Sequence, residues 1–495
     1  MHFAHIGSLL AASVALMGSS VDAATPAAWK TRTIYQIVTD RFGVANGVTP
    51  SSCGAGTNVY CGGTFQGIIS KLDYIANMGF DAIWISPVVT NVDSQNAYHG
   101  YWSQDLYSIN SHFGSASDLQ ALSSALHSRG MYLMVDVVAN HMGQQVNGNY
   151  ASNNPSAYKP FNQPSHYHPF CTISNYNNQT NVEQCWLGSS QSDGLPDLNT
   201  ENPTVYNGLY TWVKSLVGNY SIDGLRVDTV KHVRKDFWPG FNSNAGVYCT
   251  GEVLSGDPAY VSPYQGVMDG ILNYPIFYPL TRAFQKPAQG FTEMKNMINT
   301  IRSQFKDPML LTNFLENQDQ PRFPSLTGDR ALAKNAITYL LTGDGIPIIY
   351  YGQEQSFNGG NDPYNREALW TSNYNTQSEM YQHIVKVNKL RKAVKGLTTN
   401  NPITTPLTSV YDDSQAWVFR KVGMVVALSS AGSSGATQNL YVQASSLPSG
   451  QLQDVISCKT ISVGTSGTVT IQLTGGQPAV YYPSGSLGGS GICGH

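Results

Sequence analysis

The chain has 495 residues, of which 41% are hydrophobic and 12% are charged, and its formal net charge is −3. This length allows one large catalytic domain and a smaller one, with enough apolar residues for a full core. A nearly neutral chain without a basic run does not suit nucleic acid or an anionic membrane, so we expect neither as a partner.

The first 23 residues have the pattern of a secretory signal peptide. Residues 6–17 are apolar and small but too few to span a bilayer, and Val21 and Ala23 form an acceptable cleavage site. No later run is long and apolar enough for a transmembrane helix, and residues 487–495 lack the hydrophobic tail of a lipid-anchor signal. We therefore expect a secreted, extracellular protein.

From residue 34 to residue 352, short apolar runs alternate with amphipathic stretches. Strands are expected at residues 34–39, 82–86, 132–138, 224–227, 247–251, 266–272, 309–314 and 346–350. Helical patterns include residues 117–129, 204–217, 291–304 and 329–341. Eight strand–helix units predict an α/β fold, a (β/α)8 TIM barrel. Periodicity alone leaves an open doubly wound sheet as the alternative, but no glycine-rich dinucleotide motif follows any strand.

Two parts of the chain depart from this alternation. Residues 141–197, after the third strand, form a long connection rich in Asn, Ser, Pro, Tyr and Cys, which is typical of a small inserted domain. Beyond residue 398, short strands are expected at residues 416–420, 424–429, 439–442, 468–473 and 479–482. They predict a small all-β sandwich domain. The predicted organisation is a barrel of residues 24–140 and 198–402, an inserted domain of residues 141–197 and a C-terminal domain of residues 403–495.

Seven cysteines in a secreted chain suggest disulfides with one cysteine left over. Cys249 lies within an apolar strand and is expected to be a buried free thiol. The expected pairs are Cys53 with Cys61, Cys171 with Cys185, and Cys458 with Cys493.

Polar side chains arrive together at the ends of four predicted strands. Arg226 and Asp228 share one face of their strand, because side chains alternate along a strand. A salt bridge without function would look the same, but the pattern repeats at residues 136–141, at Glu252 and at residues 316–319. In a barrel of parallel strands, these ends lie on the face where catalytic side chains converge.

Three of these carboxylates suit nucleophilic and acid/base work on a glycosidic bond: Asp228, Glu252 and Asp319. One carboxylate must be ionised to attack the anomeric carbon, and Arg226 is expected to hold the pKa of Asp228 low. Another must carry a proton, which burial of Glu252 among Val253 and Leu254 would favour.

The four motifs at residues 136–141, 224–232, 251–254 and 316–319 resemble the signature regions of the α-amylases of glycoside hydrolase family 13, above all the secreted fungal members. The resemblance runs from Trp29 to Cys493. It implies retaining endo-hydrolysis of α-1,4 bonds in starch and related α-glucans. Because the predicted architecture needs no partner, we expect a monomer. Asp228 would be the nucleophile, Glu252 the acid and base, and Asp319 would bind sugar hydroxyls in the transition state.

The resemblance also implies the residues that bind the sugar chain. Those expected around the cleaved bond are His99, Tyr101, Trp102, His141 and Arg226, with Tyr101 as a stacking platform. Those expected on the acceptor side are Lys231, His232, Leu254 and Gly256. Those expected on the donor side are Asp362 and Arg366.

A structural calcium ion (Ca2+) between the barrel and the inserted domain is a further implication. The expected ligands are Asn140, Glu183, Asp197 and the main-chain oxygen of His232. Calcium takes six to eight oxygen ligands, including backbone carbonyls, so this mixture is chemically sensible. Without the resemblance, Glu183 and Asp197 would be interpreted as ordinary loop acids.

One position departs from the family pattern. The fourth region usually reads Asn-His-Asp, whereas here it is Asn317-Gln318-Asp319. The usual histidine binds sugar hydroxyls at the cleaved subsite; glutamine can donate and accept but cannot become cationic. Gln318 is therefore expected to weaken a hydrogen bond to the sugar in the transition state, which favours slow hydrolysis or transfer of the glycosyl unit to another sugar.

Three function classes follow from these residues. Hydrolysis of internal α-1,4 bonds is the first. A 4-α-glucanotransferase acting on malto-oligosaccharides or cell-wall α-glucan is the alternative that Gln318 favours. A non-catalytic α-glucan-binding protein is disfavoured, because all three carboxylates are present.

Overall fold

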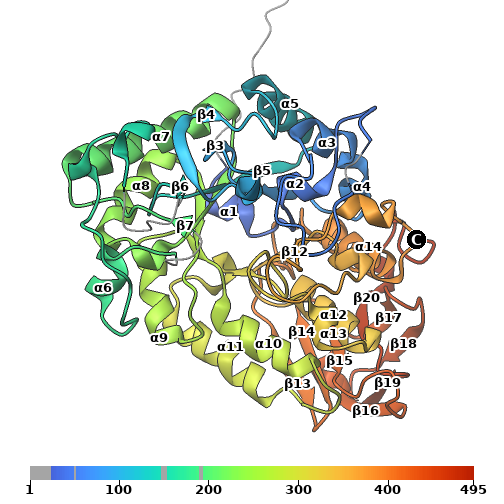
Figure 1. Cartoon of the computed structure of the whole chain (residues 1–495). Helices are drawn as coiled ribbons and strands as arrows, with labels where there is room; N and C mark the ends of the chain where they lie inside the picture. Colours follow the sequence, from blue (N-terminus) through green and yellow to red (C-terminus); the bar gives the residue numbers. More distant parts are fainter. Residues whose placement is uncertain (1–23, 50–51, 146–152, 189–192) are drawn as a thin grey trace, which may run out of the picture.

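The computed structural model describes residues 24–49, 52–145, 153–188 and 193–495, and the predicted signal peptide at residues 1–23 lies outside them. Eight parallel strands run in the order β10-β9-β8-β5-β2-β1-β12-β11. A parallel bridge between Leu272 and Thr312 joins the two outer strands, so the sheet closes into the predicted TIM barrel (Figure 1). The strands are β1 (Ile34–Ile37), β2 (Ala82–Ile85), β5 (Tyr132–Val137), β8 (Gly224–Val227), β9 (Tyr248–Gly251), β10 (Gly270–Ile271), β11 (Thr312–Asn313) and β12 (Ile346–Tyr350).

Two barrel strands are much shorter than predicted. In the span 266–272, only Gly270 and Ile271 form a strand, because a 3-10 turn occupies Ser262–Gly266. In the span 309–314, Pro308–Leu310 is also a 3-10 turn, begun by Asp307, whose side chain accepts a hydrogen bond from Met309 N. A proline and an aspartate cap start such a turn regardless of the apolar residues that follow.

Helices surround the barrel strands (Figure 1). The four predicted helices are present with ends that differ by at most three residues, as α5 (Ala116–His127), α7 (Pro203–Tyr220), α11 (Thr292–Gln304) and α13 (Arg330–Thr342). Ser115 sets the start of α5, because its side chain and that of Asp118 form a capping box. Further helices are α1 (Pro26–Trp29), α2 (Thr39–Phe42), α3 (Phe65–Ser70), α4 (Leu72–Asn77), α8 (Trp238–Ala245), α9 (Pro258–Val261), α10 (Tyr274–Phe284), α12 (Phe323–Leu326) and α14 (Glu379–Val394).

The interior of the barrel is apolar toward the amino ends of its strands and mostly polar toward their carboxyl ends. One buried cluster holds Trp29, Ile34, Ala82, Met134 and Ile346. Because inward positions recur every second residue, the next inward layer consists of Gln36, Trp84, Asp136, Arg226 and Thr250, all buried. The apolar floor therefore carries a layer of polar side chains toward the carboxyl ends of the strands.

The connection after β5 holds little regular structure. It includes β6 (Gln144–Gln145), α6 (Gln179–Gln184) and β7 (Asp193–Gly194). A second excursion, the hairpin of β3 (Val89–Asn91) and β4 (Ser103–Ile109), follows β2. The predicted domain boundaries at residues 140/141, 197/198 and 402/403 stay predictions.

The C-terminal part is all-β, as predicted. A six-stranded sheet, in the order β13-β14-β15-β20-β17-β18, packs through a shared apolar cluster on the pair β16-β19. The strands are β13 (Thr408–Asp412), β14 (Ala416–Lys421), β15 (Met424–Ser429), β16 (Gln438–Gln443), β17 (Gly450–Asp454), β18 (Thr460–Val463), β19 (Thr468–Leu473) and β20 (Ala479–Pro483). The sequence prediction missed β13, β17 and β18, whose residues are mostly polar or exposed.

The cysteine predictions are confirmed. The three disulfides are Cys53–Cys61, Cys171–Cys185 and Cys458–Cys493, and Cys249 is a buried free thiol. Within the described ranges, no helix is both long and apolar enough to cross a membrane.

Candidate active site

Arg226 binds three carboxylates at the carboxyl end of the barrel. Its Nη1 donates to Asp228 Oδ1 at 2.6 Å and to Asp136 Oδ1 at 3.0 Å, and its Nη2 lies 3.0 Å from Glu252 Oε1. The strand register places Asp136 beside Arg226, and Arg226 beside Thr250, two residues before Glu252. One buried guanidinium therefore holds Asp228 and Glu252 close together.

The backbone after β8 fixes Asp228 against Glu252. Asp228 N donates to Val137 O at 2.9 Å, and Thr229 N donates to Glu252 Oε2 at 3.1 Å. Thr229 adopts the left-handed region at φ 50°, which is disfavoured by about 1 kcal/mol for a residue with a side chain. Such strain persists only where the surroundings enforce it, as at the end of β8.

Burial changes the proton affinity of both carboxyls. Burial raises the pKa of Asp228, and Arg226 opposes this shift, so the expectation that Arg226 holds this pKa low is not met. Burial also raises the pKa of Glu252, against Arg226, and the negative charge of Asp228 raises it further. Glu252 is buried, as is Val253, whereas Leu254 is 40% exposed. Arg226 lies closer to Asp228 than to Glu252, at 2.6 Å against 3.0 Å, and so stabilises the ionised form of Asp228 more. Of the two carboxyls, Glu252 is therefore the one that keeps its proton more readily.

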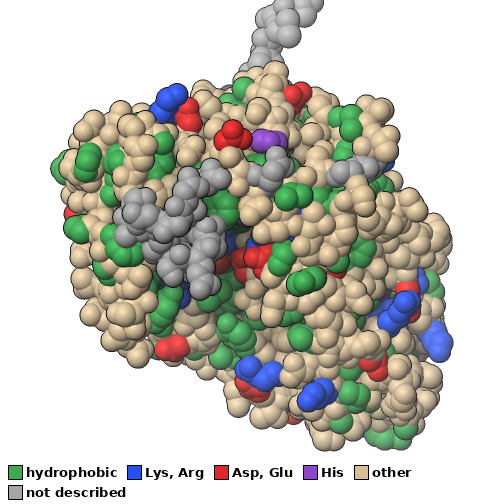
Figure 2. Space-filling view, in the orientation of Figure 1, with side chains coloured by type: hydrophobic (Ala, Val, Ile, Leu, Met, Phe, Trp, Pro, Cys, Tyr) green, Lys and Arg blue, Asp and Glu red, His purple; other side chains and the backbone are tan. Residues whose placement is uncertain are grey.

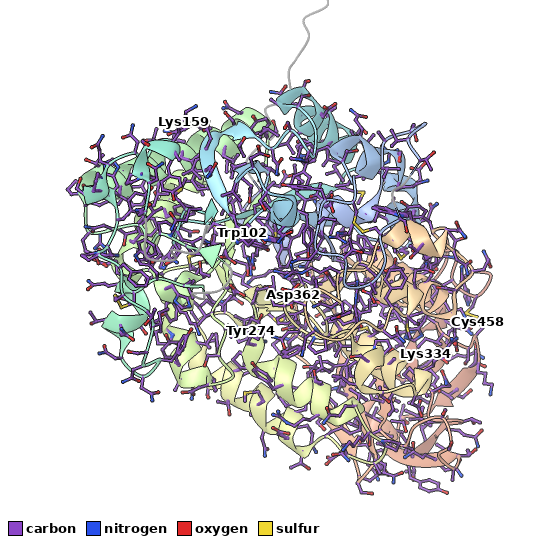
Figure 3. All side chains as sticks on the ribbon, in the orientation of Figure 1. Trp102, Lys159, Tyr274, Lys334, Asp362 and Cys458 are labelled. Carbon is purple, nitrogen blue, oxygen red and sulfur yellow. A yellow bond between two sulfur atoms is a disulfide. The ribbon has the colours of Figure 1, made fainter. Side chains whose placement is uncertain are left out.

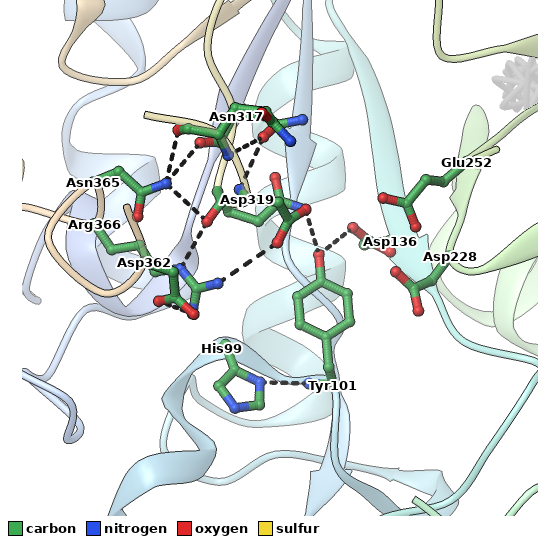
Figure 4. A network of polar contacts seen from close by, with 12 residues as sticks. His99, Tyr101, Asp136, Asp228, Glu252, Asn317, Asp319, Asp362, Asn365 and Arg366 are labelled. Carbon is green, nitrogen blue, oxygen red and sulfur yellow. Dashed lines mark hydrogen bonds and ion pairs between the residues drawn. The ribbon is translucent and has the colours of Figure 1, made fainter. Parts of the chain in front are cut away.

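Asp319 lies across from this pair (Figure 4). Its backbone N donates to Asn317 Oδ1 at 2.8 Å, and its Oδ1 lies 3.7 Å from Arg366 Nη2. Partial burial and the charge of Glu252 raise the pKa of Asp319 to about 6, and Arg366 opposes the shift. The Asp319 carboxyl therefore changes its charge at mildly acidic pH, near this pKa of about 6.

A chain of hydrogen bonds joins Gln318, through Tyr101 and Asp136, to Arg226. Tyr101 Oη donates to Asp136 Oδ2 at 2.8 Å and accepts from Gln318 Nε2 at 3.1 Å. Gln318 Oε1 accepts from Gln36 Nε2 at 2.5 Å. Trp84 Nε1 also donates to Asp136 Oδ2, at 3.2 Å. Both ends of the Gln318 amide are thus bound within the protein.

Sequence reasoning gave Gln36, Trp84 and Asp136 no role. The alternation along their strands places all three inward, and Asp136 opens the first motif, so this signal was present. Burial raises the pKa of Asp136 to about 7, and Arg226 opposes the shift.

Three aromatic residues predicted at the cleaved subsite form one wall. His99 Nδ1 accepts from Tyr101 N at 3.0 Å, and the ring of Trp102 meets that of His99 edge-on at 4.6 Å between centroids. His141 Nε2 contacts Tyr101 O at 3.2 Å. Trp102 and Asp362 lie near the centre of the same face (Figure 3).

Three of the four predicted acceptor-side residues, Lys231, His232 and Leu254, line a cavity of about 710 Å³ beside Glu252, together with Tyr176. Lys231 Nζ donates to Leu254 O at 3.0 Å. Acidic side chains lie within a hollow on this face (Figure 2). Gly256, also predicted here, does not line the cavity; it packs against Tyr278, whose ring would lie 2.9 Å from an added Cβ.

The predicted donor-side pair lies next to Asp319, away from that cavity. Arg366 Nη1 pairs with Asp362 Oδ1 at 3.1 Å and donates to Tyr98 Oη at 3.1 Å. Asn365 Nδ2 donates to Gln318 O at 3.0 Å and to two neighbouring carbonyls, which ties this loop to the segment that carries Asp319.

Comparison with known proteins agrees with this geometry. The family model of the α-amylase catalytic domain matches residues 36–407, and that of α-amylase domain C matches residues 409–495. The chain belongs to the α-amylase family. It is similar to α-amylase 2 of Schwanniomyces occidentalis, at 47% identity over 98% of this chain and 97% of the relative.

Solved structures place the chain in the same family. An α-amylase from Malbranchea cinnamomea matches with a TM-score of 0.91 and 46% identity, over 95% of this chain and 100% of the other. A cyclomaltodextrin glucanotransferase with three domains also matches, with a TM-score of 0.78 and 26% identity, over 91% of this chain and 98% of the other. The fold thus accompanies hydrolysis in some relatives and transfer in others.

Two buried oxygens fit the predicted calcium site. Among the residues that the structure describes, Asn140 Oδ1 and Asp197 Oδ1 have no hydrogen-bond partner, and buried oxygens are rarely left without one. An antiparallel bridge pairs His141 with Asp197, and His232 Nδ1 lies 3.1 Å from Val182 O, next to Glu183. These contacts bring the predicted ligands to the junction of barrel and insertion.

The set contains only two carboxylates. Among the described residues, no three His, Cys, Asp or Glu side chains gather as a metal cluster. Amide and main-chain oxygens would complete a calcium shell. Asp197 also pairs with His168, whose Nδ1 lies 2.6 Å from Asp197 Oδ2.

Proposed function

We propose that this protein is a secreted α-amylase that hydrolyses internal α-1,4 bonds of starch and related α-glucans with retention of configuration. The observation that best supports this proposal is that the Arg226 guanidinium forms ion pairs with both Asp228 and Glu252. Retaining glycosidases need their two carboxyl groups only about 5–5.5 Å apart, against about 6.5–9.5 Å for inverting enzymes. A pair bridged by Arg226 suits the closer spacing.

The roles follow from the contacts. Asp228, ionised beside Arg226, attacks the anomeric carbon while Glu252 gives its proton to the leaving oxygen, and the glycosidic bond breaks. Glu252 then takes a proton from water, which attacks the same carbon and releases Asp228. Asp319 binds hydroxyls of the sugar as positive charge develops. The cavity beside Glu252 takes the leaving part of the chain, and the Asp362–Arg366 side takes the donor part.

Calcium would be held by Asn140, Glu183, Asp197 and the main-chain oxygen of His232. There it would link the insertion to the barrel and so hold His232 at the cavity. Secretion is supported by the predicted signal at residues 1–23 and by three disulfides, which persist in oxidising compartments. We propose that the protein acts as a monomer.

A product time course on maltopentaose and soluble starch, with calcium present, tests the activity. Shorter sugars with one new reducing end per cleavage are expected. Glu252→Gln should lower kcat by about 10²- to 10⁴-fold, because the proton donor is removed while the shape is kept. Glu293→Gln, a change at an exposed surface ion pair, is the matched control and should keep wild-type activity. Wild-type kcat in Glu252→Gln would contradict the assignment.

A second candidate is a 4-α-glucanotransferase. It is favoured by the Gln318 amide, which binds Gln36 and Tyr101 rather than offering both ends to the substrate. Weaker stabilisation of the sugar in the cleaved subsite slows attack by water relative to a well-bound sugar acceptor. Products longer than maltopentaose, with little net gain of reducing ends, would establish this candidate in the same time course.

A further inference from the structure

Tyr364 is an exposed aromatic residue within the donor-side loop. Its side chain is 56% exposed, whereas the next two residues, Asn365 and Arg366, are buried. Asn365 Nδ2 and Arg366 Nε both donate to Gln318 O, at 3.0 and 3.1 Å. The backbone that carries Tyr364 is therefore fixed to the segment that carries Asp319.

The Tyr364 ring rests against Gly56. A Cβ added at Gly56 would lie 2.6 Å from Tyr364 Cε1 and 2.9 Å from Cδ1, and Gly56 has φ +84°. A residue with a side chain would be strained in this conformation and would also displace the ring. Glycine at position 56 thus allows the ring to lie directly on the backbone of a second loop.

This second loop is itself held firmly. The disulfide Cys53–Cys61 closes it, and the buried Arg41 donates from Nη2 to Thr57 O at 2.9 Å and to Val59 O at 2.8 Å. A loop closed by a disulfide and bound internally by a guanidinium has few conformations available to it. The support beneath the ring is therefore rigid.

The two loops are also joined beneath the surface. The Arg41 guanidinium lies 4.0 Å from the centroid of the Tyr98 ring, and Tyr98 Oη accepts from Arg366 Nη1 at 3.1 Å. Arg366 in turn pairs with Asp362. The contacts among Arg41, Tyr98 and Arg366 thus connect both loops. An aromatic ring on connected loops loses little conformational entropy when a ligand binds.

We propose that Tyr364 forms an additional donor-side subsite, on which a glucose unit stacks beyond the unit held by Asp362 and Arg366. A tyrosine ring offers an apolar face and a polar edge, which match the C–H face and the hydroxyls of a glucose ring. The neighbouring Asp362 is paired with Arg366, so the site suits a neutral chain. This inference rests on the proposed function.

The direction along the chain follows from Glu252. As proton donor, Glu252 faces the leaving part of the substrate, which fills the cavity of Lys231 and Leu254. Tyr364 directly precedes Asn365 and Arg366, which lie on the Asp319 side of the site, opposite Glu252 (Figure 4). Tyr364 therefore contacts the part of the glucan that forms the glycosyl-enzyme. It does so further from the cleaved bond than a short oligosaccharide extends.

The test compares Tyr364→Ala with wild type on maltoheptaose and maltotriose. The ratio of kcat/KM for maltoheptaose to that for maltotriose should fall about 3- to 10-fold, through KM, because one stacking contact is lost. Tyr364→Phe, which keeps the ring, should restore most of the ratio. Tyr441→Ala, at a tyrosine 63% exposed on β16 of the C-terminal domain, is the matched control and should leave the ratio at the wild-type value.

A ratio in Tyr364→Ala equal to that of the wild type would overturn the inference, as would an equal loss on both substrates. A binding measurement separates this outcome from failure of the proposed function. In the Asp228→Asn background, which does not turn over, adding Tyr364→Ala should raise the Kd for maltoheptaose by a similar factor. A wild-type enzyme without turnover would reject the proposed function; an unchanged Kd would reject the subsite.

Discussion

Gln318 illustrates what one residue does in this site. Its amide accepts from Gln36 and donates to Tyr101, and Tyr101 donates to Asp136, which pairs with Arg226. The substitution that departs from the family pattern is therefore accommodated by a buried glutamine on β1. Both amide ends lie within the wall of the cleft, which reduces what Gln318 offers to a sugar.

Gln318→His should raise the rate of starch hydrolysis by about 5- to 150-fold, if the imidazole restores a transition-state hydrogen bond worth about 1–3 kcal/mol. The share of transfer products from maltopentaose should fall at the same time. Gln320→His, which adds a histidine to the same segment away from Tyr101, is the control and should change neither quantity. Unchanged hydrolysis in Gln318→His would reject the causal role of Gln318.

At the scale of elements, α6 (Gln179–Gln184) joins the insertion to the barrel. Val182 O contacts His232 Nδ1, and the side chain of Gln179 donates to Lys231 O at 2.9 Å. Both barrel residues line the acceptor cavity, so the position of α6 helps to determine the shape of that cavity. The disulfide Cys171–Cys185 fixes the segment that carries this helix.

Removal of calcium should therefore loosen α6 and lower stability. Chelation with EGTA is expected to lower the Tm by several degrees, since an ion bound at 100 times its Kd stabilises the fold by about 2.7 kcal/mol. Asp197→Asn should abolish most of this calcium-dependent shift, which scanning calorimetry can measure. Glu201→Gln, which also changes a partner of His168, is the control. A full calcium shift in Asp197→Asn would contradict the predicted ligand set.

At the scale of the whole molecule, a buried lysine joins the C-terminal sheet to the barrel. Lys421 Nζ donates to Gly343 O at 2.7 Å and to Ile403 O at 3.1 Å, and it lies 3.4 Å from Asp344 Oδ1. Burial lowers the pKa of Lys421 to about 8, and Asp344 opposes this shift. The interface between the two parts of the chain thus contains a titratable group.

This pKa predicts how stability depends on pH. Between pH 8 and the ordinary lysine pKa of 10.5, the unfolded chain binds more protons than the folded chain, so the contribution of Lys421 to stability rises with pH. Across this pH window, the free energy of unfolding of the wild type should rise by up to about 3 kcal/mol relative to that of Lys421→Met. Urea unfolding from pH 7.5 to pH 10 measures the difference. The exposed Lys459→Met should show no such trend, and a flat difference for Lys421→Met would refute the prediction.

The sequence by itself determined the eight strand–helix units, the all-β C-terminal domain, the disulfide pairs and the polar strand ends, whereas the bridge between Leu272 and Thr312 shows that the sheet closes. These depend on local signals: alternation along strands, apolar faces of helices and short spacings between cysteines. The contact between Arg226 and Asp228 was predictable for the same reason, because residues two apart on a strand share a face.

Only the tertiary structure decided which distant residues meet. Gln36 and Gln318 lie 282 residues apart in sequence. They meet because β12 pairs with β1, which carries Gln36, and with β11, which Gln318 follows along the chain. Gly56 and Tyr364 meet for a similar reason, since two loops fold over the same rim. Burial raised the pKa of Asp228 where the sequence suggested the opposite, because desolvation depends on everything packed around a group and not only on its nearest charge.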